Sequence, residues 1–546
     1  MVNKKKAVLC KNILGLREQG IKGFVISEGK IESTIKDTSS INKMEMEVID
    51  YGENFITPGF IDSHNHFLTT SLQLEYGIDL DSSSQINFST LIDKIKSFSK
   101  KNTFPWIIGR GLNSSYFQEK ALPDRKVLDR SGVDKPIFLI HQSGHAAVCN
   151  SLALIEAGLL SKDIVDPIGG RIGRYSDGSP NGILYEKAAM DLVRAKIPKY
   201  TKADYKRAMI DIQKKYILSG LTCVKDTGGN GFPIDELSRI EALNEMDSAG
   251  ELLIRIGISI PIFSFNEVDS KVDLSKKIIQ TEKLFFAGFK LFLDGSGLNK
   301  TAWMKEPWLP NDTAKNEGDR GIVRMELDDF KAIIKKLCSI DTVISIHAVG
   351  DAAVAYVLST IREVKEMGCK ARFTIVHAYI PTKEDLMIMK KYDVSVETQT
   401  SFLWLLGEQI IKNLGSSRAK RLFPIKDYLS NGINVCLTSD SPVSNFDPVL
   451  SIFSSTRRAV KTETGIVIHN EEQRISLVDS VKCLTENPAK VLGKKEIGSL
   501  EVGAFADFIV WPKSFTEIPQ NDCYPRITPM AVYISGVNIF KELEGE

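Results

Sequence analysis

Short apolar segments alternate with longer amphipathic ones through the middle of the chain. This alternation is typical of a parallel α/β architecture. Eight short segments qualify as strands, and eight is the number of strands that closes a (β/α)8 barrel of the TIM type. We predict these strands in PGFIDSHNH near 58–66, LTCVKD near 221, LIRIGISI near 253, FAGFKLFLDG near 286, TVISIHAVG near 342, RFTIVHAY near 372, VSVETQT near 394 and NVCLTSD near 434.

The stretches between the later strands have helical periodicity. Apolar residues recur there at i, i+3 and i+4, which predicts helices over 330–340, 352–368 and 383–392. The first and second strands are separated by about 150 residues, far more than an ordinary connection between a strand and a helix. We therefore expect a large insertion after the first barrel strand, forming a lobe at about 75–215.

Both ends of the chain have the pattern of short strands separated by turns. The first 57 residues contain KKAVLCKNIL, GFVISEGKIE and EVIDYGENFI, and the tail from about 495 contains IGSLEVGAFADFIVWPK and MAVYISGVNIF. We infer that the two ends pair into one composite β-sandwich. The expected domains are thus a sandwich of 1–57 plus 492–546 and a barrel of 58–491 that includes the lobe.

Composition and charge narrow the class of protein. The chain has 546 residues, 43% of them hydrophobic and 25% charged, which excludes disordered and low-complexity classes. A net charge of +1 gives no field for gathering nucleic acid or anionic membrane, so we expect neither as a partner. The eight cysteines are dispersed without a C-x-x-C pair, so we expect reduced thiols. With no secretory signal or long apolar run, we predict a cytoplasmic protein.

The histidines coincide with the predicted strand ends. The chain has only seven histidines, and four of them fall at the carboxyl ends of predicted strands, where barrel enzymes assemble their sites. His64 and His66 in FIDSHNH are two residues apart, so on a strand both side chains face the same way. They are therefore candidate ligands of one metal ion, although an H-x-H pattern alone is also typical of surface or hydrogen-bonded histidines.

Three more polar residues end apolar strands in the same manner. His347 closes TVISIH, His377 closes FTIVH and Asp440 ends NVCLTSD. Imidazole and carboxylate groups at one end of a barrel suit a divalent metal. Taken singly, each histidine is as well explained by a satisfied buried side chain, and Asp440 by a helix N-cap. Taken together, they favour a shared site.

Lys290 in AGFKLFLDG lies inside an apolar strand, where a free ammonium group is costly to bury. Reaction with carbon dioxide would convert it into an anionic oxygen ligand able to bridge two metals. The alternative is a lysine paired with a carboxylate such as Asp294.

The motifs together resemble a known family. TPGFIDSHNHF, GFKLFLDGS, SIHAVGDAAV, TIVHAY, LTSDSPV, ENPAKVLG and GSLEVGAFADFIV resemble the amidohydrolase superfamily in order and spacing. The segments GRG, SGHAAVCNSLAL and GGRIGRYSDGSPNGILYE are similar to its family-3 branch, which includes N-substituted formamide deformylase-like proteins. The resemblance implies a barrel with a composite sandwich and a binuclear metal site, most often with two zinc ions.

The resemblance also implies a role for each candidate residue. His64 and His66 would bind the more buried metal, His347 and His377 the more exposed one, and carboxylated Lys290 would lie between them. Asp440 would be a ligand and the catalytic proton shuttle. His145 in the inserted lobe would bind the substrate or its oxyanion, or else hold the lobe as a structural residue. A homodimer is the family-level expectation.

The expected reaction is hydrolysis of a non-peptide C–N bond in a small amide-like or formamide-like substrate. A hydroxide held by the metals would attack the carbonyl carbon, and Asp440 would pass its proton to the leaving nitrogen. One alternative is a deaminase of a heterocyclic ring with a single metal. Such relatives usually lack the strand lysine and have a glutamate shortly after the fifth-strand histidine, where HAVGD has none. A non-catalytic scaffold is the other, but scaffolds of this fold typically lose metal ligands.

Overall fold

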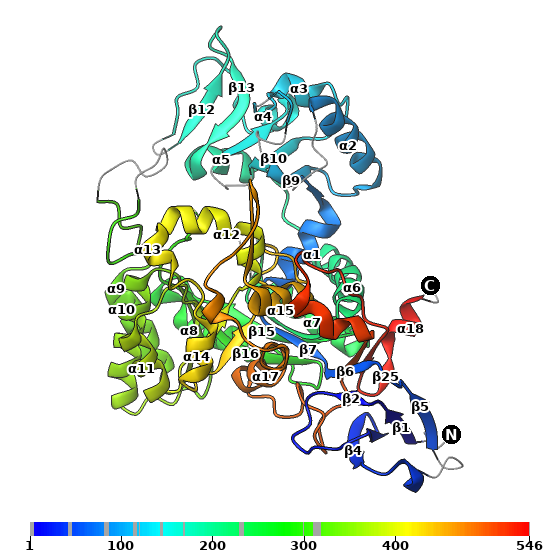
Figure 1. Cartoon of the computed structure of the whole chain (residues 1–546). Helices are drawn as coiled ribbons and strands as arrows, with labels where there is room; N and C mark the ends of the chain where they lie inside the picture. Colours follow the sequence, from blue (N-terminus) through cyan, green and yellow to red (C-terminus); the bar gives the residue numbers. More distant parts are fainter. Residues whose placement is uncertain are drawn as a thin grey trace. The chain divides into compact units, whose positions relative to one another are not determined.

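The computed structural model divides the chain into two compact units, and each is described by itself. The larger unit is built from the chain up to Phe67 and from Gln213 onwards, and the smaller one mainly from Leu68–Ile212. Figure 1 shows the course of the chain. The structure describes residues 5–41, 46–80, 87–112, 117–119, 121–141, 146–167, 170–228, 234–298, 300–309 and 318–544.

The larger unit contains a parallel eight-stranded sheet, in the order β20-β19-β18-β17-β16-β15-β14-β7. Backbone hydrogen bonds from Asp440 N to His64 O (3.0 Å) and from His66 N to Ser441 O (2.9 Å) join the end of β7 to the segment that follows β20. All eight predicted barrel strands are confirmed. They are β7 (Phe60–Asn65), β14 (Leu221–Asp226), β15 (Arg255–Pro261), β16 (Leu284–Phe292), β17 (Val343–Ala348), β18 (Arg372–His377), β19 (Ser395–Thr398) and β20 (Val435–Leu437).

The barrel strands are buried along almost their whole length, as expected for parallel strands with both faces covered. The three predicted helices are also confirmed, each with its apolar stripe buried. They are α9 (Leu327–Leu337), α10 (Asp351–Glu366) and α11 (Lys383–Lys391). Other helices of the larger unit are α7 (Glu236–Ser248), α8 (Val268–Ser275), α12 (Ser401–Leu414), α14 (Ile425–Ser430), α15 (Pro448–Arg457), α16 (Leu477–Lys482) and α17 (Glu486–Leu492).

The two ends of the chain form a composite β-sandwich, as predicted. One sheet has the order β4-β3-β1-β5, and the other, β2-β6-β23-β24-β25, mixes strands from both ends. A shared apolar core that includes Phe24, Ile56 and Phe508 lies between them. The strands are β1 (Lys5–Leu9), β2 (Asn12–Ile13), β3 (Gly23–Ser27), β4 (Lys30–Ile35), β5 (Met46–Asp50), β6 (Phe55–Pro58), β23 (Phe508–Trp511), β24 (Ala531–Ile534) and β25 (Val537–Asn538).

A buried ion pair ties the barrel to the sandwich. Arg255, the first residue of β15, donates from Nε to Asp507 Oδ2 (2.7 Å) and from Nη2 to Asp507 Oδ1 (3.1 Å). Its remaining donors reach Ser535 Oγ (2.9 Å) and the carbonyl of Glu282 (2.9 Å). Every guanidinium nitrogen therefore has a partner although the side chain is buried.

The smaller unit is inserted between β7 and β14. It contains a six-stranded mixed sheet in the order β12-β13-β11-β10-β9-β8. Its apolar core includes Ile107, Leu139 and Val148. The strands are β8 (Gly77–Asp79), β9 (Ile107–Leu112), β10 (Ile137–His141), β11 (Ala146–Cys149), β12 (Arg171–Arg174) and β13 (Pro180–Tyr185), accompanied by α2 (Phe88–Lys101), α3 (Arg125–Asp129), α4 (Ser151–Glu156) and α5 (Glu186–Arg194).

The expectation that all cysteines are reduced thiols is wrong for two of them. Cys338, just after α9, and Cys369, in the segment after α10, form a disulfide with their Cα atoms 4.6 Å apart. The packing of α9 against α10 brings the two residues together, and their separation of 31 positions hid the pair in the sequence. In the part of the chain that the structure describes, no helix combines the length and apolar character needed to cross a bilayer.

Candidate metal centre

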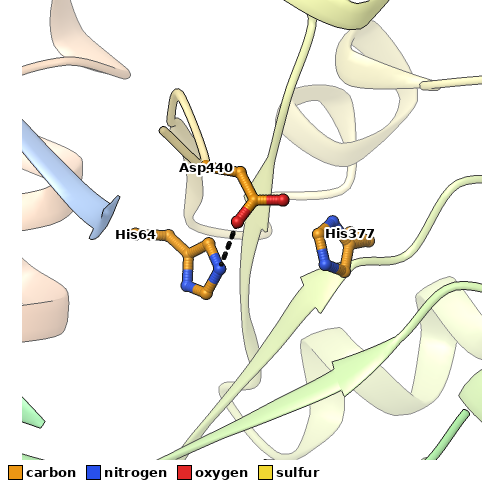
Figure 2. Close-up of side chains that lie close together, drawn as sticks. All are labelled: His64, His377 and Asp440. Atoms are coloured by element: carbon orange, nitrogen blue, oxygen red, sulfur yellow. Dashed lines mark ion pairs between the residues drawn. The ribbon is translucent and has the colours of Figure 1, made fainter. Parts of the chain in front are cut away.

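The polar residues predicted at the strand ends lie together at the carboxyl end of the barrel. His64 is on β7, His377 ends β18 and Asp440 follows β20, and all three are buried. One ligand atom from each lies within 4.8 Å of the others (Figure 2). Three strands that are distant in the sequence thus bring two imidazoles and a carboxylate to one point.

Asp440 connects the two histidines of the first strand. Its Oδ1 atom is 3.1 Å from His64 Nε2 and 3.3 Å from His66 Nε2. Burial by itself raises the pKa of the Asp440 carboxyl, but the contacts with both imidazoles outweigh it and hold the pKa well below its usual range. The carboxylate is therefore kept ionised in a buried position, as a metal ligand must be.

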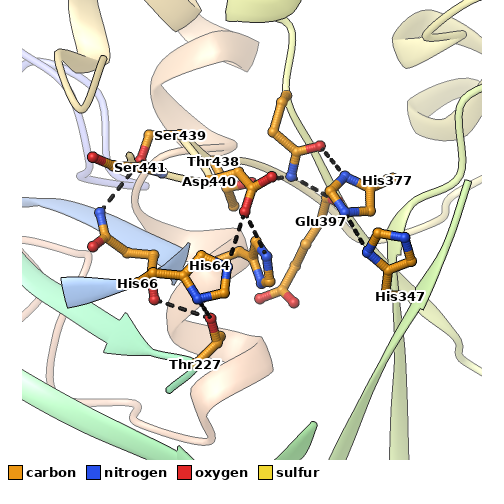
Figure 3. Close-up of polar contacts among 12 residues, drawn as sticks. His64, His66, Thr227, His347, His377, Glu397, Thr438, Ser439, Asp440 and Ser441 are labelled. Atoms are coloured by element: carbon orange, nitrogen blue, oxygen red, sulfur yellow. Dashed lines mark hydrogen bonds and ion pairs between the residues drawn. The ribbon is translucent and has the colours of Figure 1, made fainter. Parts of the chain in front are cut away.

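Hydrogen bonds at Nδ1 orient the imidazoles of His66 and His377. His66 Nδ1 donates to the carbonyl of Gly228 (2.8 Å), so Nε2 is the nitrogen that faces Asp440. His377 Nδ1 donates to Gln399 Oε1 (2.7 Å), and Gln399 Nε2 donates to Thr438 Oγ1 (2.8 Å) (Figure 3). Metal-binding histidines commonly donate their second N–H to a carbonyl in this way.

His347 and His377 form a second pair of imidazoles. His347 Nε2 donates to the carbonyl of Gly295 (2.9 Å), so its Nδ1 carries a lone pair. That atom lies 3.0 Å from His377 Nε2, which carries the other lone pair. Two facing lone pairs repel unless a proton or a cation lies between them. Nitrogens about 3 Å apart are close to the spacing of two ligands of one tetrahedral zinc, with Zn–N distances of about 2 Å.

The backbone at this end of the barrel is strained. His377 has φ 80° and Asp440 has φ 54°, both in the left-handed region that side chains other than glycine rarely adopt. Each such residue costs of order 1–3 kcal/mol, and the surrounding hydrogen bonds must hold it in place. Backbone strain of this kind is typical of functional sites, where side chains must be held in particular positions.

Lys290 lies on β16 and is completely buried. Its Nζ atom has no hydrogen-bond partner among the described residues. Burial is the main reason why its pKa is lowered to about 7; the nearby Lys225 charge acts in the same direction, and the Glu397 and Asp440 charges oppose it. The amine is therefore easily held without its proton.

Asp294, the partner considered for Lys290 from the sequence, is bound elsewhere. Its carboxylate accepts backbone N–H groups from Trp303 (2.9 Å), Val349 (3.0 Å) and Gly350 (2.9 Å). It fixes the segments that follow β16 and β17. An ion pair between Lys290 and Asp294 is not present.

The residues fit divalent cations. Imidazole nitrogens and carboxylate oxygens are ordinary ligands of zinc. The two facing nitrogens of His347 and His377, and the buried Lys290 nitrogen without a partner, are arrangements that a cation and an anionic ligand would satisfy.

Comparison with known families decides what kind of protein carries this arrangement. The model of an amidohydrolase family matches residues 47–540, most of the chain. The chain belongs to the amidohydrolase family. As an amidohydrolase it is an enzyme, a metal-dependent hydrolase of carbon–nitrogen bonds other than peptide bonds.

Two relatives of this amidohydrolase are similar to it over most of their lengths. LONG AFTER FAR-RED 3 of Arabidopsis thaliana is 28% identical over 494 residues, covering 89% of this chain and 82% of the plant protein. N-substituted formamide deformylase of Arthrobacter pascens is 24% identical over 536 residues, 95% of each chain. A crystal structure of an uncharacterized metal-dependent hydrolase from Pyrococcus horikoshii has a TM-score of 0.76 at 24% identity, covering 94% of this chain and 98% of that one, which supports the fold.

Sequence reasoning missed part of the amidohydrolase barrel interior. Lys225 on β14 and Glu397 on β19 are completely buried and paired, with Lys225 Nζ 2.7 Å from Glu397 Oε1. The signal was available, because each is a charged residue inside an apolar strand. The same signal singles out Lys290.

One predicted residue could not be placed. His145, the candidate for substrate or oxyanion binding, lies outside the described residues. The other six predicted residues are all in the larger unit.

Proposed function

We propose that the protein hydrolyses the C–N bond of a small amide or formamide-like molecule with two zinc ions at the carboxyl end of the barrel. The observation that carries the proposal is the convergence of His64, His377 and Asp440. His66 Nε2 lies 3.3 Å from Asp440 Oδ1, and His347 Nδ1 lies 3.0 Å from His377 Nε2. N-substituted formamide deformylase is among the relatives, which supports the substrate class.

We assign the ligands to two groups, with Lys290 between them and Asp440 as a further ligand. His64 and His66 hold one cation, and His347 and His377 hold the other. Divalent cations, when bound, act as Lewis acids that polarise a carbonyl and make water nucleophilic near neutral pH.

Lys290 joins these ligands after reaction with carbon dioxide. The unprotonated amine forms an N–C bond to carbon dioxide, and the nitrogen releases one proton to solvent, which leaves a carbamate anion. The missing hydrogen-bond partner of Nζ and the lowered pKa, caused mainly by burial, support this assignment.

Asp440 is the proposed proton carrier. Its carboxylate takes a proton from the attacking water and delivers it to the leaving nitrogen. Its left-handed backbone and its contacts with His64 and His66 aim the carboxylate at the point where the two groups of ligands meet. His145 is proposed as a further group for substrate binding, on the resemblance alone.

A hydrolysis screen with parallel metal analysis tests the proposal. The protein, loaded with zinc, is offered N-formyl amines, N-acyl amino acids and cyclic amides, and metal content is measured by mass spectrometry. We expect about two metals per chain and turnover of one class, abolished by a chelator and restored by zinc. One metal per chain with deaminase activity instead would overturn the proposal, and so would a chain that binds no metal in zinc-supplemented medium.

The proposal also covers the domain boundaries, the partners and the location of the protein. We propose the domain boundaries predicted above, a homodimer, and the absence of nucleic-acid and membrane partners, which the near-zero net charge supports. We also propose a cytoplasmic location. The Cys338–Cys369 disulfide makes that location worth testing directly, because disulfides are rare in the cytosol of most organisms.

A further inference from the structure

Three charged side chains lie completely buried inside the barrel. Lys225 is on β14, Lys290 on β16 and Glu397 on β19. The proposed function uses Lys290 but gives no role to the other two. Charges are costly to bury, so their presence in the interior calls for an explanation.

Lys225 and Glu397 are bonded to each other and reach the strand beside Lys290. Lys225 Nζ is 2.7 Å from Glu397 Oε1 and donates to Ser345 Oγ at 3.0 Å. Ser345 is the lateral partner of Lys290 between β16 and β17. Side chains of lateral partners in parallel strands point to the same face of the sheet, so the pair lies on the same side as Lys290.

Two buried atoms in this group have no hydrogen-bond partner among the described residues. One is an acceptor, Glu397 Oε2, and the other is the Lys290 nitrogen, which is a donor. A buried polar group without a partner costs about 1–3 kcal/mol. Of the charges that act on Lys290, that of Glu397 is the strongest attractive one. The two unsatisfied atoms are therefore complementary.

We propose that Glu397 is a positioning residue for Lys290, and that Lys225 holds it in place. Glu397 Oε2 accepts the one N–H that the Lys290 nitrogen keeps after carboxylation, which turns the carbamate oxygens toward the cations. The inference rests on the proposed function, because it assumes that Lys290 is carboxylated. Lys225 occupies Oε1 and balances the Glu397 charge, so the pair adds no net charge beneath the site.

Two matched double variants distinguish the effect of the Glu397 acceptor oxygen from the effect of the Lys225–Glu397 charges. K225M/E397Q and K225M/E397L both remove the ion pair, but glutamine keeps a side-chain oxygen and leucine has none. Replacing a whole buried ion pair by apolar groups of similar volume is often neutral for stability. Circular dichroism and thermal unfolding are used to check that each variant is folded.

The readouts are independent of turnover. Each protein is equilibrated with 13C-labelled bicarbonate and zinc, the carbamate carbon is observed by NMR, and bound zinc is counted. We expect wild type and K225M/E397Q to carry the labelled carbon and two metals per chain. K225M/E397L should lose at least about five-fold of the labelled carbon and with it one metal.

Each contrary outcome has a distinct meaning. Equal labelling of the two double variants, whether high or low, would overturn the role of the Glu397 oxygen and leave the proposed function standing. Absence of label in wild type would overturn the carboxylated lysine and this inference together.

A further variant serves if K225M/E397L does not fold. E397D keeps the charge and withdraws the carboxylate by one carbon–carbon bond, about 1.5 Å. We expect weaker labelling than in wild type, and wild-type labelling would count against the inference.

Discussion

Two buried cations on neighbouring barrel strands have opposite surroundings. Arg255 opens β15 at the end nearest the sandwich, and all its nitrogens are hydrogen-bonded, two of them to Asp507. Burial lowers the pKa of Arg255, but Asp507 outweighs it and raises the pKa overall. Lys290 lies near the other end of β16. Its nitrogen has no hydrogen-bond partner among the described residues, and its pKa is lowered to about 7, mainly by burial.

The different surroundings of Arg255 and Lys290 indicate different roles for the two ends of the barrel. A fully bonded guanidinium is a structural joint, because removing either partner leaves an unpaired buried charge. The Lys290 amine has no hydrogen-bond partner in the described part of the chain, and its lowered pKa makes it available for chemistry. We therefore expect substitutions at the sandwich end to lower stability, and substitutions at the carboxyl end to lower activity.

The largest effect is expected from Asp440→Asn at the carboxyl end. Asparagine keeps an oxygen that can bind metal but cannot take up a proton, so turnover should fall by about 10²–10⁴-fold with little change in metal content. Asp393→Asn is the matched control, because the Asp393 side chain is 77% exposed and pairs with Lys490 in a surface bridge. Unchanged turnover in Asp440→Asn would refute the proton-carrier role.

Arg255→Met tests the opposite end. It leaves Asp507 buried without its partner, so the free energy of unfolding should fall by about 3–5 kcal/mol. Turnover per folded molecule and zinc content should stay at the wild-type level. Urea unfolding gives the stability, and zinc analysis of the native protein checks the site. A selective loss of zinc would contradict the division between the two ends.

Lys290→Met should have the smallest effect on stability, and in the favourable direction. It replaces an unsatisfied buried amine by an apolar chain of similar volume, so the metal-free protein should gain about 1–3 kcal/mol. Zinc binding and turnover should be lost at the same time. The measurement compares chelator-treated wild type and variant by urea unfolding; a loss as large as that of Arg255→Met would mean that Lys290 is structural.

Much of the architecture could be predicted from the sequence. Parallel barrel strands are buried on both faces, so each appears as a short apolar run, and the polar residue ending the run marks the functional edge. That logic located His64, His347, His377 and Asp440. The composite sandwich was readable because both ends share a pattern of short strands and turns.

Other features depend on contacts that one sequence does not display. The Lys225–Glu397 pair joins strands whose residues are 172 positions apart, so neither partner indicates the other. The same holds for Gln399, whose side-chain amide orients His377 from 22 positions away. The disulfide depends on how two helices end beside each other.

The mixed sheet of the sandwich has a consequence for how the protein is made. Strand β6 lies between β2 and β23, so one of its neighbours is synthesised near the start of the chain and the other near residue 510. During translation β6 therefore keeps an open sheet edge until the residues of β23, near residue 510, have left the ribosome. A nascent chain stalled before β23 exposes that edge to pairing with other chains. Chaperones that mask strand edges would therefore be needed longest at the amino-terminal strands.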